Sequence, residues 1–166
     1  MAVQVQDRDA LRRAFARVPA SIVAVCAQVG SQRIGMAAST FVPVSLDPPL
    51  VGICVQNSSA TWPRLARQER MGISVLSVEH DRIVRVLAAK DGDRFSGVDT
   101  ESHPGGALFI ARASLWLDVT LQEQLPAGDH AIALLRVNKI SWPQDADEAI
   151  EPIIFHRSSF RSLATA

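Results

Sequence analysis

The hydrophobic pattern of the chain is mostly strand-like. Residues 114–123 carry an apolar side chain at every second position, which is the period of a half-buried strand. Residues 7–18 instead repeat apolar side chains at helical spacing before Pro19, so they predict a helix, which we expect to cover an open end of a barrel. The other predicted strands are 21–28, 33–38, 50–56, 71–76, 130–142 and 153–155, and the other predicted helices are 61–68 and 79–89.

The connections between these elements complete the expected fold. Residues 39–49 predict a stiff loop that ends in two prolines, and residues 90–106 predict a polar, glycine-rich functional loop. Turns are expected at 30–32 and 126–129, and an acidic loop at 144–151. Many strands, short turns and two or three helices predict a mainly β protein, a β-barrel with flanking helices, in a single domain over residues 1–166.

The charge and composition of the chain argue against several classes of protein. The chain has 166 residues and no net charge, with 17 basic and 17 acidic side chains, which argues against binding to nucleic acid or to an anionic membrane. The first dozen residues are too polar for a secretory signal, and no apolar run approaches a membrane span. Cys26 and Cys54 lie in apolar strands, where reduced thiols are expected, so we predict a cytoplasmic protein.

Motifs for several common sites are missing from the sequence. It has no G-x-G-x-x-G after a strand, no phosphate-binding G-x-x-x-x-G-K-S/T and no G-x-S-x-G. It also lacks H-E-x-x-H and paired cysteines, so we predict no metal site.

Residues 33–61 carry the candidate chemistry. Small residues at Gly35, Ala37 and Ala38 would let a flat ligand approach the backbone. Hydroxyls at 58, 59 and 61 precede a predicted helix, whose first N–H groups favour an anion. Together they suggest a phosphorylated planar cofactor. The alternative is an ordinary strand, turn, strand and helix cap.

Five motifs, in one order, resemble a known family. The run G-M-A-A-S-T-F-V-P-V-S-L-D-P-P-L-V, from Gly35, is similar to the G-M-T-x-S-S-F-x-S-V-S-x-x-P-P-L stretch of the flavin reductase-like, FMN-binding split-barrel family. The other four are Q-N-S-S-A-T from Gln56, D-R-F-S-G-V from Asp93, G-D-H from Gly128 and F-H-R-S-S-F from Phe155. The resemblance extends from about Phe15 to Phe160.

The resemblance implies a fold and an activity. It implies a Greek-key split barrel that reduces free FMN or FAD with NADH or NADPH and supplies reduced flavin to a partner monooxygenase. A homodimer is implied as well, because the flavin cleft of this family lies beside a subunit interface. Two alternatives remain open: a flavoprotein that keeps its FMN and transfers electrons, and a non-catalytic barrel that binds another planar ligand.

The resemblance also assigns the site. It assigns the isoalloxazine and ribityl groups to the residues after Gly35, and the phosphate to the hydroxyl cluster with Gln56 at its edge. Arg94 could add a cation and Phe95 a packing surface. The alternative is that Arg94 is an ordinary surface arginine. The assigned cofactor residues are Met36, Ala37, Ala38, Ser39, Thr40, Gln56, Ser58, Ser59, Thr61, Arg94 and Phe95.

The nicotinamide side is assigned to three further residues. His130 is the candidate catalytic residue facing the nicotinamide, with a structural histidine as the alternative, and Arg157 is a candidate for holding the pyridine nucleotide. Phe160 stands where the family has Tyr or Phe, and because the chain has no tyrosine, a phenol role is ruled out there. The pair Ala37-Ala38 and Pro43 replace hydroxyl residues of the family pattern, and each lost hydrogen bond would weaken flavin binding by about 0.5–1.5 kcal/mol.

Overall fold

The computed structural model describes residues 7–89, 91–142 and 150–163. Its helices are α1 (Arg8–Phe15), α2 (Trp62–Leu65), the 3-10 turn η1 (Val78–His80) and α3 (Asp81–Ala88). Its strands are β1 (Ala20–Ser21), β2 (Val23–Val29), β3 (Gln32–Ala38), β4 (Val42–Leu46), β5 (Pro49–Gln56), β6 (Met71–Val75), β7 (Thr100–Ser102), β8 (Leu108–Ile110), β9 (Leu115–Ala127), β10 (His130–Ser141), β11 (Ile154–His156) and β12 (Ser159–Arg161).

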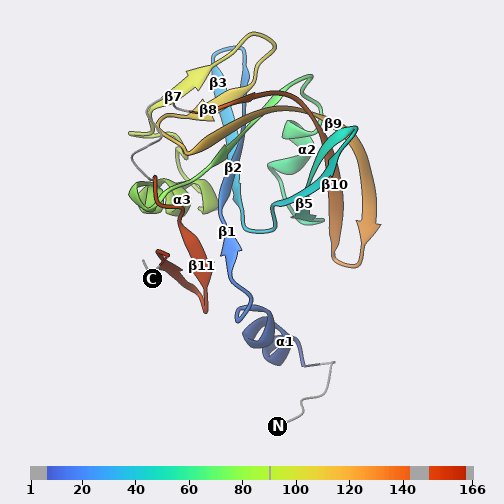
Figure 1. The fold of residues 1–166 in the computed structure, drawn as a ribbon, viewed down its shortest axis with the longest axis vertical. Coiled ribbons are helices and arrows are strands. Elements are labelled where there is room, and N and C mark those ends of the chain that lie inside the picture. The colour runs from blue at the N-terminus through green and yellow to red at the C-terminus, as the bar shows by residue number, and fades with distance from the viewer. Residues whose placement is uncertain (1–6, 90, 143–149, 164–166) are drawn as a thin grey trace.

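One curved antiparallel sheet forms the barrel (Figure 1). Its seven strands run in the order β3-β2-β6-β9-β10-β5-β4, so β3 and β4 are its two end strands. Thr40, just after β3, links this end of the sheet to β5. Its hydroxyl accepts a hydrogen bond from the Cys54 N–H at 2.8 Å and donates to the Cys54 carbonyl at 3.1 Å. The predicted mainly β fold is confirmed.

Two apolar cores lie on opposite faces of the sheet. One fills the barrel and includes Val25, Ile53, Ile73 and Leu135, with Leu65 of α2 packed among them. The other lies outside, under α3 and β8. Alternate residues of β2 enter different cores, which explains why this strand is apolar throughout.

The two cysteines occupy different environments. Cys26 is fully buried in the outer core, and burial raises the pKa of its thiol to about 12, so it stays protonated and packs as a small apolar group. Cys54 is half-buried, and both thiols are free.

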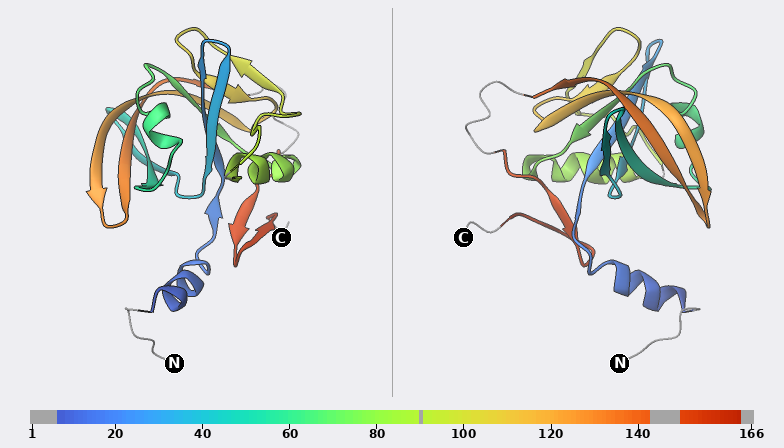
Figure 2. Two further views of the ribbon diagram at one scale, coloured as in Figure 1. Left: turned by 180° about the vertical axis from the view of Figure 1, so that it is seen from behind. Right: turned by 45° about the vertical axis from the view of Figure 1, so that its right-hand side comes forward.

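The prediction for the first helix is wrong in one respect. α1 forms, with the Asp7 carboxylate accepting from the N–H groups of Asp9 and Ala10, but it ends at Phe15. It does not pack over the end of the barrel (Figures 1 and 2) and contacts the β9–β10 turn through an ion pair between Arg8 and Asp129 at 3.2 Å. Phe15 and Val18 of its predicted apolar face are 69% and 65% exposed. The amphipathic pattern indicates an apolar face but not what covers it.

Several predicted connections contain strands. The expected loop 39–49 includes β4, whose one proline, Pro43, is tolerated because β4 is an end strand. The expected loop 90–106 includes β7, which pairs with β8. β9 continues to Ala127, so the turn expected at 126–129 is only Gly128-Asp129. The helix α2 is shorter than its predicted span of 61–68. The acidic loop predicted at 144–151 falls largely outside the described residues.

No helix among the described residues has the length and apolar character needed to cross a membrane.

Candidate functional site

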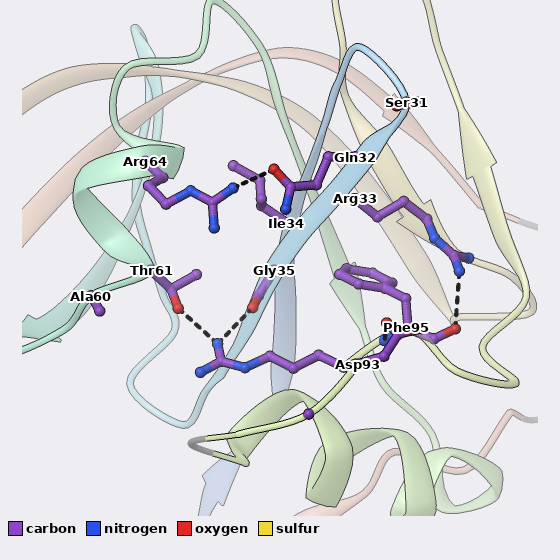
Figure 3. Close-up of a pocket in the computed structure, with 12 residues that line it drawn as sticks. Ser31, Gln32, Arg33, Ile34, Gly35, Ala60, Thr61, Arg64, Asp93 and Phe95 are labelled. Atoms are coloured by element: carbon purple, nitrogen blue, oxygen red, sulfur yellow. Dashed lines mark hydrogen bonds between the residues drawn. The ribbon is translucent and has the colours of Figure 1, made fainter.

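The strand β3 borders a polar cavity of about 600 Å³ (Figure 3). As an end strand it has β2 on one side, and the cavity lies along its other side. The start of α2 and the 92–95 segment form the opposite wall. The lining residues are Ser31, Gln32, Arg33, Ile34, Gly35, Ala60, Thr61, Arg64, Gly92, Asp93, Arg94 and Phe95.

Arg94 joins the two walls of this cavity. Its Nη1 donates to the Thr61 hydroxyl at 2.7 Å and to the Gly35 carbonyl at 3.1 Å. No ion pair links Arg94 to a carboxylate in the described parts of the chain. The guanidinium is therefore held in place while its charge remains available to an anion. Thr61 and Arg94, which are 33 positions apart and were both predicted to bind the phosphate, therefore lie in contact.

Arg33 and Arg64 are two further guanidinium groups of the cavity. Arg33 donates to the carbonyls of Phe95 and Val98, both at 3.1 Å, so it fastens the 95–98 segment to β3. Arg64 donates from Nη2 to Oε1 of Gln32 at 2.7 Å. Neither residue belongs to the site predicted from the sequence. The only signal for Arg64 is its place three residues after Thr61, one helical turn further on.

The remaining phosphate residues lie around the start of α2. The Ser59 hydroxyl accepts from the Trp62 N–H at 3.1 Å, whereas Thr61, the N-cap residue of α2, makes no side-chain capping bond. Ser58 is exposed. Because α2 has only four residues, its dipole is small, and the hydroxyls with Arg94 are the main candidates for an anion.

Phe95 is a core residue at this site. It is 3% exposed, and its ring packs with Cys26 in the outer core below Arg33. A Cβ built on Gly35 would lie 2.8 Å from this ring and 2.6 Å from the Cys26 sulfur, so glycine is required there. Little of the Phe95 ring is left to contact a cofactor.

The residues predicted for the flavin ring divide between two faces of β3. Met36 and Ala38 belong to the barrel core, which leaves the Met36 backbone rather than its side chain for a ligand. Ala37, Ala38 and Ser39 line an apolar hollow of about 260 Å³ that also contains Phe160. The structure thus brings Phe160 beside the predicted ring site.

His130 and Gln56 are neighbours at one end of the barrel. They are directly opposite each other in the β5–β10 pair. Nδ1 of His130 lies 2.7 Å from Oδ1 of Asp129, and this hydrogen bond, the largest of several causes, lowers the pKa of the Asp129 carboxyl below its ordinary value. The ionised carboxylate therefore accepts a hydrogen bond from Nδ1–H of His130, which leaves Nε2 for a ligand.

Arg157 lies away from these groups, next to α1. It occupies the β11–β12 turn with a φ of 51°, and its N–H donates to the Ala16 carbonyl at 2.7 Å. A hollow of about 360 Å³ there is lined by Arg157 together with Arg12, Arg13 and Arg17. The structure does not bring Arg157 to the cavity beside β3.

The donor set suits a phosphorylated organic group and not a metal. Hydroxyls and a fixed guanidinium are phosphate ligands. Within the described ranges, no three histidine, cysteine or carboxylate side chains are grouped so that they could hold a metal ion.

Comparisons with known proteins identify the family of the chain. Residues 15–164 match the family described as flavin reductase like domain. The chain is 32% identical to the actinorhodin polyketide dimerase of Streptomyces coelicolor, over 96% of this chain and 89% of that protein. It is 31% identical to the stachydrine N-demethylase reductase subunit of Rhizobium meliloti, over 82% of this chain and 60% of that protein.

A solved structure resembles the whole fold. It is the NADH:FAD oxidoreductase of Streptomyces globisporus in complex with NAD and FAD fragments. The TM-score is 0.90 at 33% identity, over 99% of this chain and 97% of that chain.

Proposed function

Because the chain belongs to the flavin reductase-like family, we propose that it is an NAD(P)H-dependent flavin reductase. It binds FMN or FAD, reduces the flavin with NADH or NADPH, and releases reduced flavin to a partner monooxygenase. The observation that carries this proposal is the position of the Arg94–Thr61 pair directly beside the open edge of β3.

The open edge of β3 supplies the ledge for the flavin ring. The Gly35 carbonyl points away from β2, because it accepts from Arg94. In an antiparallel pair, alternate residues point their peptide groups to the same side. The N–H and C=O of Ala37 therefore face the same open edge, where they can pair with the polar edge of a flavin. Backbone donors there would stabilise negative charge on the reduced ring.

Thr61 and Arg94 hold the flavin phosphate in this proposal, with Ser58 and Ser59 alongside. The Arg94 guanidinium keeps donors beyond the Nη1 that bonds to Thr61 and Gly35, so it can contact a phosphate without losing its own anchors. Substituting Ser59 and Thr61 together by Ala should weaken FMN binding. An unchanged affinity would remove this phosphate site.

His130 positions the nicotinamide donor in this proposal. When bound, the flavin accepts hydride from the nicotinamide, so the protein needs mainly to stack two rings in contact. Asp129 fixes the His130 ring, and Gln56 lies opposite it. Phe160 offers an aromatic wall in the hollow shared with Ala37. Arg157 reaches a ligand only at the arginine-lined hollow beside α1, where it would meet the phosphates of the pyridine nucleotide.

The deciding experiment measures NADH and NADPH oxidation with FMN, FAD and riboflavin added in turn. Oxidation that depends on added flavin supports the proposal. A purified protein that stays yellow through gel filtration favours the flavoprotein that retains FMN. A folded protein without flavin-dependent oxidation favours the non-catalytic barrel.

We also infer that the chain forms a homodimer through α1. Phe15, the last residue of α1, and Val18, three residues after it, are exposed on a segment that does not pack over its own barrel. Such residues need a packing partner, and a second copy of the chain would supply it. The double variant F15S/V18S should sediment as a monomer, whereas the matched variant R13S should stay dimeric. Two monomeric proteins, or two dimeric ones, would contradict this interface.

A further inference from the structure

The cavity beside β3 continues well beyond the phosphate residues. Thr61 and Arg94 meet β3 at Gly35, and the lining then follows the strand back to Ser31 at the β2–β3 turn (Figure 3). Four extended residues span about 13 Å. A volume of about 600 Å³ is that of a site for a whole small molecule rather than for one phosphate.

We propose that this extension binds the adenosine monophosphate half of FAD, so that the chain binds FAD more tightly than FMN. FAD differs from FMN by this half alone. With the flavin ring beside residues 36–40 and its first phosphate at Arg94, the second phosphate and the adenosine extend along β3 toward Ser31. The inference rests on the proposed function and specifies its flavin.

Arg64 is the group that would recognise the second phosphate. Its guanidinium is held by Gln32 through one nitrogen, at 2.7 Å, and no carboxylate pairs with it within the ranges that the structure describes. It lies on the same wall as Thr61, one helical turn further along the chain. Two fixed guanidinium groups in a row match two consecutive phosphates. Arg33 does not serve, because the carbonyls of Phe95 and Val98 already hold it.

The far end of the cavity suits a nucleoside rather than another phosphate. Asp93 is not part of this end, because it directly precedes Arg94 and its Oδ1 accepts from the Phe95 N–H at 2.9 Å (Figure 3). Neutral hydroxyl and amide groups can pair with the ribose hydroxyls and the adenine nitrogens. The Ser31 hydroxyl and the Gln32 amide line the same end.

The test compares the dissociation constants of FAD and FMN for the flavin-free protein, measured by calorimetry and by quenching of flavin fluorescence. The unmodified protein should bind FAD at least about tenfold more tightly than FMN, which equals about 1.4 kcal/mol. Arg64→Ala should raise the constant for FAD by about tenfold and that for FMN by less than about twofold. Arg64→Lys should retain part of the preference. Arg67→Ala is the control, because Arg67 is exposed and lies outside the cavity.

Three results would overturn the inference. Equal affinity for FAD and FMN in the unmodified protein would show that the extension binds no part of the flavin. An equal loss for both flavins in Arg64→Ala would place Arg64 at the first phosphate. A rise only in the KM for NADH would assign the extension to the pyridine nucleotide. In each case flavin-dependent NADH oxidation would persist, whereas its absence with every flavin would refute the proposed function itself.

Discussion

Replacing Arg94 by Ala is the most direct test of the phosphate site. The change removes a partly buried guanidinium whose Nη1 bonds both the Thr61 hydroxyl and the Gly35 carbonyl. A phosphate at this position would lose a charge-assisted hydrogen bond, which contributes about 1.5–3 kcal/mol. Two unit charges about 4 Å apart attract by about 4 kcal/mol near a protein surface, so this range is physically reasonable. The dissociation constants of FMN and FAD should rise by about 10- to 150-fold.

Riboflavin is the internal control for this substitution. It carries the flavin ring without phosphate, so its affinity for Arg94→Ala should change by less than about twofold. Calorimetric titration at two salt concentrations adds a second readout, because screening weakens the interaction of exposed charges. FMN binding to the unmodified protein should weaken with salt, and binding to Arg94→Ala should weaken less.

Two outcomes would refute the reasoning behind Arg94. An equal loss of riboflavin and FMN affinity would mean that Arg94 supports the ledge of β3 rather than the phosphate. Unchanged affinity for all three flavins would mean that the phosphate binds elsewhere. Arg94→Lys separates charge from geometry, since lysine keeps the cation but cannot reproduce the guanidinium hydrogen bonds.

Further predictions concern stability. The buried His80 accepts hydrogen bonds at Nδ1 from the N–H and hydroxyl of Ser77, and its burial lowers the pKa of its ring. The unfolded chain therefore binds this proton more readily, so the stabilisation by neutral His80 is complete above about pH 6.5 and is lost as the pH falls, by at most about 1.4 kcal/mol per pH unit. Urea denaturation from pH 7.5 to 5 should show a steeper loss for the unmodified protein than for His80→Asn, and parallel curves would contradict the assignment. Gly72→Ala should lower the melting temperature sharply, because a Cβ there would lie 2.2 Å from the Leu108 carbonyl oxygen. Gly30→Ala, with nothing within 4 Å but a φ of 58°, should cost only about 1 kcal/mol, and similar melting temperatures for the two variants would contradict the packing.

The sequence predicts the barrel strands better than the segments around them. The predicted bounds of β3, β5, β6 and β10 agree with the structure to within one residue because these strands are apolar and end at turn residues. β4 was missed because Pro43 within it, and Pro48 and Pro49 after it, are typical of loops, and the place of β4 at the end of the sheet makes Pro43 acceptable. The exposure of α1 could not be foreseen, since periodicity does not identify the surface that covers an apolar face.

The site shows the same division between local and non-local information. The family motifs named Thr61 and Arg94 separately, and the structure joins them by a hydrogen bond. Gln32 and Arg64 belong to no motif, and their contact depends on how α2 lies against β3. A polar pair of this kind leaves no periodic signal in the sequence. Assignments that rest on backbone groups, such as Ala37, likewise require the strand order to be known.

The position of β3 at the end of the sheet also bears on colloidal stability. Unpaired peptide groups on an end strand are a template for strands of other molecules, and cationic side chains are one means of blocking that pairing. Arg94 donates a hydrogen bond to the Gly35 carbonyl at this edge, and a bound flavin would cover the peptide groups that follow. Flavin-free preparations should therefore aggregate more readily on storage than flavin-saturated ones. Adding the coenzyme to the storage buffer should keep the protein soluble and active for longer.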